Sequence, residues 1–118
     1  MRVMITALLL ASGGVQAQTA PGLSGARTVD LSTDPAKPYT QPMELRLNPD
    51  GTVAGSFYNS EIVGGRWKTD RGRTCASFRT SDGQGPYHSS ACLEGDTVRG
   101  QTWAEHRNFL FNWNAVRR

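Results

Sequence analysis

Residues 73–104, with the sequence RTCASFRTSDGQGPYHSSACLEGDTVRGQTWA, contain three runs of alternating apolar and polar residues separated by glycine-containing turns. Alternation with a period of two is typical of strands that bury one face. Gly83-Gln84 and Gly95-Asp96 each suit a two-residue hairpin turn. These turns predict the cross-strand pairs Phe78 with Ser89, Ala76 with Ala91, Leu93 with Val98 and Ala91 with Gly100.

The same pattern continues on both sides of this stretch. Asn48-Pro49-Asp50-Gly51 predicts a type I turn followed by a glycine bulge, and Arg71-Gly72 predicts a two-residue hairpin. His106-Arg107 is the weakest turn, because neither residue favours a positive φ. Eight short antiparallel strands joined by tight turns predict an all-β up-and-down barrel, with a sandwich or a partly open barrel as alternatives. We expect these strands near residues 27–33, 43–48, 52–59, 62–69, 73–81, 86–94, 97–105 and 108–116.

The registers set by these separate turns agree on one apolar face, and a slip of one residue would destroy the agreement. The further pairs are Leu47 with Val53, Leu45 with Gly55, Met43 with Phe57, Trp67 with Ala76, Gly65 with Phe78, Gly100 with Trp113, Thr102 with Phe111 and Ala104 with Phe109. Three glycines lie opposite large residues, where the missing side chain leaves room. The predicted core is Met43, Leu45, Leu47, Val53, Phe57, Trp67, Ala76, Phe78, Ala91, Leu93, Val98, Phe109, Phe111 and Trp113.

The chain begins with a short apolar segment, Val3 to Ala11, followed by small residues up to Ala17. This pattern predicts a signal peptide, residues 1–17, and a periplasmic or secreted protein, with a buried strand as the alternative. The apolar segment is too short to span a membrane. Residues 18–42 are expected to hold a flexible segment, a possible first strand and a Pro-rich loop, and residues 43–118 complete one β-meander domain.

Cys75 and Cys92 are the two cysteines of the chain, and in an exported protein they are expected to form a disulfide. Pair types alternate outward from the Gly83-Gln84 turn. The two cysteines therefore fall opposite each other at a non-hydrogen-bonded position, where side chains of neighbouring strands come closest. Two free thiols are the alternative.

Composition and motifs exclude several classes of function. Removing 17 of the 118 residues leaves 101, and the loss of Arg2 lowers the net charge from +3 to +2. The basic residues are scattered, whereas nucleic-acid-binding proteins cluster them, so we expect no nucleic acid partner. No hydrolase, zinc-protease, nucleotide-binding or C-x-x-C motif is present. We therefore expect no catalytic residue, no metal and no cofactor.

The polar face of the predicted sheet carries the candidate binding residues. The registers align one row of Arg79, His88, Trp103 and Leu110, and a second row of Ser77, Ser90, Gln101 and Asn112. A tryptophan beside an arginine and a histidine would stack a planar or sugar ring, with the amides of the second row reading hydroxyl groups. The alternative is that Trp103 is surface cover. Tyr87 is expected at the core edge, and His106 and Arg107 as solvated loop residues.

Residues 50–58, DGTVAGSFY, resemble the hairpin pattern of the avidin and streptavidin family, in which Asp-Gly precedes an apolar residue, a glycine and an aromatic residue. Thr102-Trp103 and Trp113 look like the Trp-bearing strands of that family. The resemblance implies an up-and-down barrel over about a third of the predicted mature chain, through a motif that hairpin rules favour. Residues 27–30, RTVD, lack the family's tryptophan and its biotin-contacting asparagine and serine, so no binding residue is carried over. The chain also resembles small periplasmic barrels of proteobacteria.

Three functions follow from this interpretation. The first is a non-enzymatic periplasmic module that binds an unknown small molecule through Arg79, His88, Trp103, Gln101 and Asn112, or through a barrel mouth. The second is a proteinaceous inhibitor or envelope protein that binds another protein. The third is a small enzyme. A pocket lined by converging polar groups would favour the first function.

Overall fold

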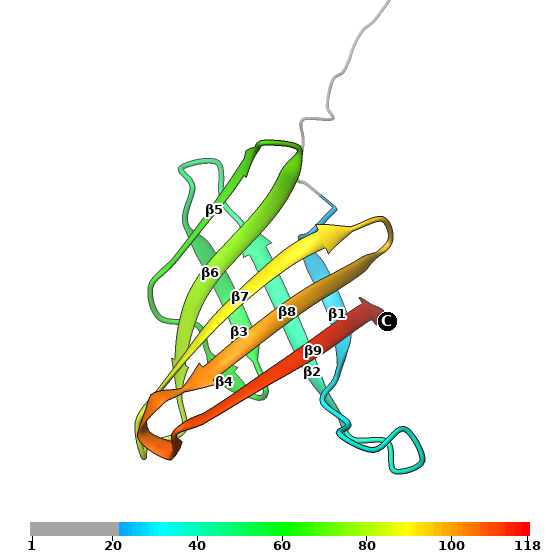
Figure 1. The fold of residues 1–118 in the computed structure, drawn as a ribbon. Helices are drawn as coiled ribbons and strands as arrows, with labels where there is room; N and C mark the ends of the chain where they lie inside the picture. Colours follow the sequence, from blue (N-terminus) through cyan, green and yellow to red (C-terminus); the bar gives the residue numbers. More distant parts are fainter. Residues whose placement is uncertain (1–21) are drawn as a thin grey trace, which may run out of the picture.

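The computed structural model describes residues 22–118, so the predicted signal peptide lies outside the described residues. The described chain forms nine antiparallel strands in a single curled sheet (Figure 1). The strands are β1 (Gly25–Asp30), β2 (Thr40–Leu47), β3 (Val53–Phe57), β4 (Ser60–Glu61), β5 (Gly65–Asp70), β6 (Arg73–Ser81), β7 (Pro86–Glu94), β8 (Thr97–Ala104) and β9 (Phe109–Arg117). A 3-10 turn, η3 (Glu105–Arg107), connects β8 to β9.

The sheet curls into a partly open barrel. Its strand order is β4-β3-β2-β1-β9-β8-β7-β6-β5. The first strand along the chain, β1, therefore pairs with the last, β9, and the sheet is not closed between β4 and β5. At that seam Thr52 forms an isolated bridge with Arg66, and the Trp67 N–H donates to the Gly51 carbonyl at 3.0 Å. Of the architectures expected from the sequence, the partly open barrel is the one observed.

One predicted strand, residues 62–69, is divided. The Ile62 N–H donates to the Gly55 carbonyl of β3, whereas the Val63 N–H donates to the Arg79 carbonyl of β6. The chain thus changes partner between these two residues, and Gly64 follows with φ of 75°. This change of partner accounts for nine observed strands where eight were expected.

Every cross-strand pair that the turns predicted is present in the ladders. Arg71 and Gly72 both have positive φ, 52° and 78°, as a two-residue hairpin requires. Gly51, with φ of 91°, supplies the bulge after the 48–51 turn, and its N–H donates to the Asn48 carbonyl. The register is therefore set locally, hairpin by hairpin.

The turn expected at His106-Arg107 is wrong in type. Residues 105–107 form η3, and the positive φ falls on Asn108 at 52°. Asparagine tolerates the left-handed conformation better than histidine or arginine does. The Asn108 N–H donates to the Glu105 carbonyl at 3.1 Å, which closes the loop without shifting the predicted pairing of Ala104 with Phe109.

The predicted core face is the inner face of the barrel, and most of its members are buried. Trp113 is 3% exposed and packs on Phe57 with ring centroids 5.1 Å apart. A Cβ at Gly100 would overlap the Trp113 indole, so this glycine gives the ring its space as expected. Phe109 is a correction, because it is 45% exposed at the end of the barrel, beyond the residues of β9 that pair with β1 in the described chain. The half-buried members are Trp67, Leu93 and Phe111.

The inner face also holds polar residues that the sequence reasoning left out. The Trp113 indole N–H donates to Thr102 Oγ1 at 2.9 Å, and Thr102 Oγ1 lies 2.8 Å from Ser89 Oγ. Thr102 and Ser89 are buried. These bonds satisfy the polar atoms of the Trp113, Thr102 and Ser89 side chains, which would otherwise be costly to bury.

One end of the barrel is filled by Leu23, which was expected in a flexible segment, and by Arg27, the first residue of the predicted strand 27–33. Leu23 is fully buried, and Arg27 of β1 lies inside the barrel. The Arg27 guanidinium donates to the carbonyls of Gly22 and Asp96, at 2.6 and 3.2 Å. Burial and the nearby Arg117 lower the pKa of Arg27. The chain entering β1 therefore plugs this end.

The predicted disulfide is present between Cys75 of β6 and Cys92 of β7. The two residues are directly opposite in the ladder, with their Cα atoms 4.1 Å apart. This short separation is typical of a non-hydrogen-bonded antiparallel pair. The prediction from sequence spacing is confirmed.

Candidate functional site

The outer face of the sheet carries the predicted row of binding residues in the expected order. Arg79 pairs with His88, His88 with Trp103, and Trp103 with Leu110 across β6 to β9. Trp103 is 38% exposed and Leu110 is 51% exposed. His88 Nε2 lies 3.4 Å from Glu105 Oε1. The row exists as a surface, and its role in binding stays a prediction.

The second predicted row is also in place, but its amides bind each other. Gln101 Nε2 donates to Asn112 Oδ1 at 2.9 Å on the exposed face. This bond uses one donor and one acceptor that a ligand hydroxyl would need. The pair therefore stiffens the sheet surface as well as offering its remaining polar atoms to solvent.

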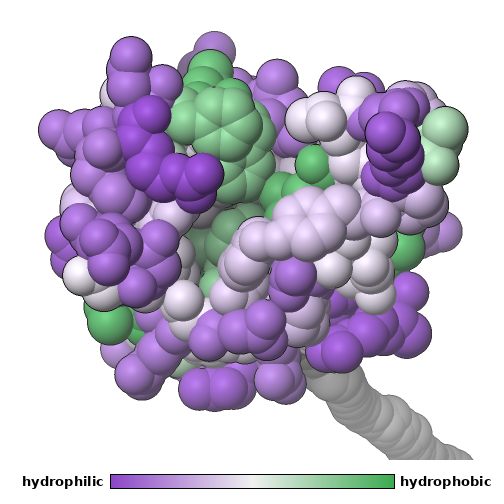
Figure 2. Space-filling view, turned by 90° about the horizontal axis from the view of Figure 1, so that it is seen from below, coloured by the Kyte–Doolittle hydropathy of each residue, from purple (hydrophilic) through white to green (hydrophobic). Residues whose placement is uncertain are grey.

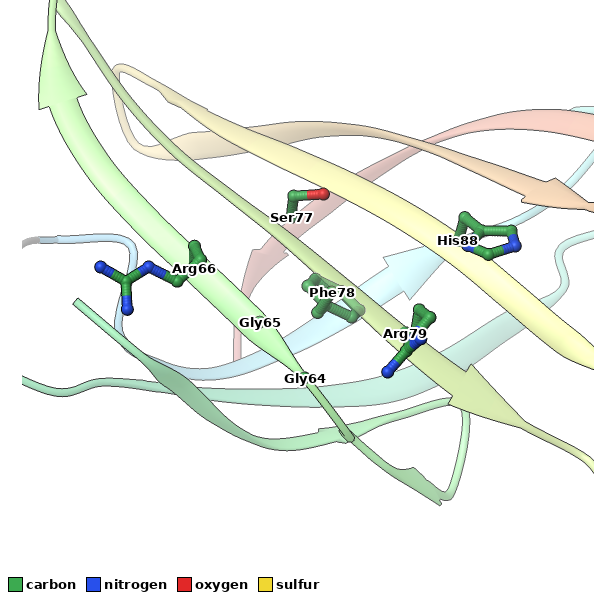
Figure 3. A pocket seen from close by; sticks show the side chains of 7 residues that line it. All are labelled: Gly64, Gly65, Arg66, Ser77, Phe78, Arg79 and His88. Carbon is green, nitrogen blue, oxygen red and sulfur yellow. The ribbon is translucent and has the colours of Figure 1, made fainter.

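A groove of about 450 Å³ runs beside the first row and is shown in Figure 3. Only Arg79 and His88 of the predicted residues line it, together with Gly64, Gly65, Arg66, Ser77 and Phe78. The Arg79 guanidinium lies over Gly64, where a Cβ would come within 2.9 Å of it. In Figure 3 the side chains of Arg66 and His88 are directed to opposite ends of the groove. The polar groups of this groove thus do not converge on one point.

A larger cavity of about 810 Å³ occupies the open end of the barrel, which we call the mouth. It lies at the end that carries η3 and the β1–β2 loop, seen at the bottom of Figure 1 and face-on in Figure 2. Figure 2 shows a hollow lined by apolar side chains and surrounded by a polar rim. The cavity is lined by residues of the β1–β2 loop, of β3 and the turn into β4, of β6 and β7 with the loop between them, and of η3 and β9.

Aromatic side chains form two walls of the mouth. On one side Phe109 and Phe111 stack with centroids 5.3 Å apart, and the Arg107 guanidinium lies 5.8 Å from the Phe109 ring centre. On another side Tyr39 and Tyr58 meet edge to face at 6.1 Å. Aromatic faces of this kind bind apolar and planar groups.

The polar rim of the mouth contains a hydrogen-bonded chain of three side chains. The Tyr87 hydroxyl donates to Asp82 Oδ2 at 2.6 Å, and Arg107 donates to the Tyr87 oxygen at 3.2 Å. The bond from Tyr87 lowers the pKa of Asp82. Burial and the same bond raise the pKa of Tyr87, and the bond to Tyr87 raises that of Arg107.

His106 supports this rim from behind. Its ring meets Tyr87 edge to face at 5.0 Å, and its Nε2 lies 3.8 Å from Asp82 Oδ1. A Cβ at Gly85 would overlap the His106 ring, so the glycine allows this close approach. His106 and Arg107 were expected to be solvated loop residues, and both are exposed residues of the turn between β8 and β9. Their side chains also contact Asp82 and Tyr87, and this contact was not expected. The sequence signal that pointed to this contact was the position of both loops at the same end of the meander.

Within residues 22–118 no helix is long and apolar enough to cross a membrane, and no three His, Cys, Asp or Glu side chains gather as metal ligands would. Comparison with known proteins gives no match, because no protein family, curated protein or solved structure is significantly similar to this chain. The resemblance to avidin and streptavidin therefore stays a prediction from the hairpin pattern alone.

Proposed function

We propose that this protein is a non-enzymatic ligand-binding module and that the mouth of the barrel is its binding site. The observation that carries the proposal is the cavity of about 810 Å³ with aromatic walls and a bonded polar rim. Ligand pockets are typically about 300–1,000 Å³, mostly apolar, with a few fixed polar groups. Barrels of about eight strands hold one small ligand at this position in other folds.

The ligand chemistry follows from the lining. Phe109 is 45% exposed, and an apolar or aromatic group placed against it would remove that ring from water. The Arg107 guanidinium beside the ring adds a donor for an oxygen of the ligand. The mouth therefore suits an apolar or aromatic group that carries at least one hydrogen-bond acceptor.

The rim groups are suited to fixing the shape of the mouth. A carboxylate with a lowered pKa, such as Asp82, is a weak base at neutral pH. A tyrosine with a raised pKa, such as Tyr87, stays protonated there. Both groups are held in one hydrogen-bonded chain, as expected for residues that fix the shape of a rim.

We also propose that the protein is exported and works in the periplasm or outside the cell. The Cys75–Cys92 disulfide supports this location, because such bonds persist in oxidising compartments. The predicted signal peptide gives a direct test. N-terminal sequencing of the protein from fractionated cells should find Gln18 first, and a cytoplasmic protein that retains Met1 would contradict the proposal.

The mouth is tested by titration with 1-anilinonaphthalene-8-sulfonate, a planar aromatic probe that carries an acid group and fluoresces in apolar sites. Phe109→Ser removes a ring from the mouth, and Leu110→Ser is its matched control. The two residues are neighbours in β9, are similarly exposed, and face opposite sides of the sheet. We expect the affinity of Phe109→Ser to fall roughly tenfold, the equivalent of about 1.4 kcal/mol, and that of Leu110→Ser to be unchanged. Equal binding by the two variants would place the probe elsewhere and remove the mouth as the site.

A further inference from the structure

Among residues 22–118, the edge of β9 beside the mouth has no neighbouring strand. β8 pairs with β9 along Phe109 to Ala115, whereas β1 pairs with it only from Asn114 to Arg117. Residues 109–113 of β9 therefore have a partner on one side only within the described chain. This free edge opens directly into the mouth, because Phe109 and Phe111 line the cavity.

The backbone groups that point to the free edge belong to Leu110 and Asn112. In an antiparallel strand, the N–H and C=O of alternate residues point to opposite neighbours. The Arg118 N–H donates to the Ala26 carbonyl, which turns the even-numbered residues of β9 toward β1. Leu110 and Asn112 continue that series past the end of β1. Their two N–H and two C=O groups thus face the side where β1 has ended.

The way in which β1 ends explains why the N–H and C=O groups of Leu110 and Asn112 have no partner strand in the described chain. Extending the pairing of Asp30 with Asn114 would place Ser32 opposite Asn112. The Ser32 N–H instead donates to Asp30 Oδ1 at 2.9 Å. The Leu31 N–H donates to the Tyr39 carbonyl, so the chain stays paired toward β2 as it leaves β9. These two bonds hold the β1–β2 hairpin away from β9 beyond Asp30.

The free edge lacks the features that usually protect one. Natural edge strands carry charged residues or proline, which prevent pairing with another chain. Residues 109–114, FLFNWN, contain neither. We propose that an extended segment of a partner polypeptide pairs with Leu110 and Asn112 as an added strand and places an apolar side chain in the mouth. This inference rests on the proposed function and names its ligand class.

The shape of the opening and the absence of charged residues from 109–114 of β9 favour a single extended segment. Ser32 and Lys37 of the β1–β2 loop line one side of the cavity, and Phe109 and Phe111 line the other. A second copy of this chain would have to bring its own β1–β2 loop into the same space. The uncharged edge favours an uncharged segment, in which alternate side chains enter the mouth and the others face solvent. Strand addition of this kind takes its affinity from main-chain hydrogen bonds and its specificity from side-chain pockets.

The test uses a displayed library of random seven-residue peptides, selected on the full folded protein. The decisive variants are Leu110→Pro and Leu110→Ser. Both lose the same exposed leucine side chain, but only proline removes the N–H that points to the free edge. Because that N–H makes no bond to β8, proline is tolerated here as it is on other sheet edges. We expect selected peptides to be uncharged and alternating, and to bind Leu110→Pro at least tenfold more weakly than Leu110→Ser.

A second measurement keeps the test valid if Leu110→Pro does not fold. Each selected peptide is synthesised again with N-methyl groups on alternate amides, which removes its N–H donors and leaves its side chains. One of the two alternations should lose at least tenfold in affinity for the wild-type protein. Peptide binding should also slow hydrogen exchange at the Leu110 and Asn112 amides, whereas the Phe111 amide, bonded to β8, is slow already.

Three outcomes would overturn the inference. One is that no peptide is enriched, another is that selected peptides bind both Leu110 variants equally, and the third is that N-methylation has no effect. A dimer of the wild type that Leu110→Pro converts to a monomer would assign the edge to self-association instead. Failure of the proposed function can be distinguished from failure of this inference, because binding of the fluorescent probe depends on the Phe109 ring and not on the backbone N–H of Leu110. If the probe binds and peptides do not, only the strand addition fails.

Discussion

Replacement of Trp113 and of Trp103 by alanine should separate the inner face of the barrel from the outer one. Trp113 is 3% exposed, packs on Phe57, covers Gly100, and donates its indole N–H to Thr102. Trp103 is 38% exposed in the outer row. The two residues belong to neighbouring strands, β9 and β8, so local strand propensity differs little between them.

The magnitudes follow from burial. An aromatic side chain buries about 150–250 Å², and about 25 cal/mol per Å² gives roughly 4–6 kcal/mol for the whole side chain. The Cβ of alanine retains part of this burial free energy. Trp113→Ala should therefore lower the free energy of unfolding by about 3–5 kcal/mol, the range of other buried aromatics. Trp103 has mainly cross-strand contacts, worth about 0.2–1 kcal/mol each. Trp103→Ala should therefore cost about 1–2 kcal/mol.

Chemical denaturation followed by far-ultraviolet circular dichroism measures both variants, because the substitutions remove fluorophores. Trp113→Phe replaces the indole by a smaller aromatic ring and removes its N–H. The lost hydrogen bond alone costs about 1 kcal/mol, and this variant serves if Trp113→Ala does not fold. Trp103→Phe is its control and should be close to the wild type. Equal losses for Trp103→Ala and Trp113→Ala would refute the assignment of the two faces.

Two further perturbations test the disulfide and the rim. Cys75→Ser removes the bond to Cys92, which lies 17 positions further along the chain. Loop-closure entropy then predicts a loss of about 3 kcal/mol, which lowers Tm by roughly 12–24 °C for a domain of this size; a variant that melts with the oxidised wild type would contradict it. Asp82→Asn tests the bond from Tyr87, which holds the Asp82 pKa below its ordinary value of 3.8. A lowered carboxyl pKa stabilises the folded state above that value, and the contribution is lost as pH falls through the lowered pKa. The wild type should therefore melt higher than Asp82→Asn at neutral pH and lose this advantage below about pH 3.8, whereas a difference that grows with acidity would show the opposite sign.

The hairpin registers were predictable because the information is local. A turn such as Arg71-Gly72 fixes its own closing pair, and the period of two carries that choice along both strands. Cys75 and Cys92 could be paired by counting outward from one turn. The outer row of Arg79, His88 and Trp103 followed from the same counting. Every part of the fold that depended on one hairpin at a time was correct in register.

The pairing of β1 with β9 has no turn to set it, since the two strands come from opposite ends of the described chain. The burial of Leu23 and Arg27 depends on that pairing. Leu23 could therefore not be separated from a flexible segment, and the predicted strand at residues 27–33 did not reveal that Arg27 lies inside the barrel. Phe109 has the apolar, inward-facing pattern of a core residue. It is exposed because it lies beyond the last residue of β1, and a single strand does not reveal where its neighbour ends.

The mouth and the free edge have one structural cause. The Pro-rich segment 34–42 gives the β1–β2 hairpin a long connection, and the bond from Leu31 to Tyr39 keeps that hairpin paired with itself after it leaves β9. The same separation exposes Phe109 and leaves Leu110 and Asn112 without a strand. At the opposite end Leu23 and Arg27 are buried inside the barrel, whereas the mouth is an open cavity in the described part of the chain. A peptide with an aromatic side chain would pair with the free edge at Leu110 and Asn112 and also contact Phe109 in the mouth. A small apolar molecule would contact only Phe109. The affinities of the peptide and of the fluorescent probe for the Phe109 and Leu110 variants therefore show whether the opening between β1 and β9 binds an extended peptide or a small apolar molecule.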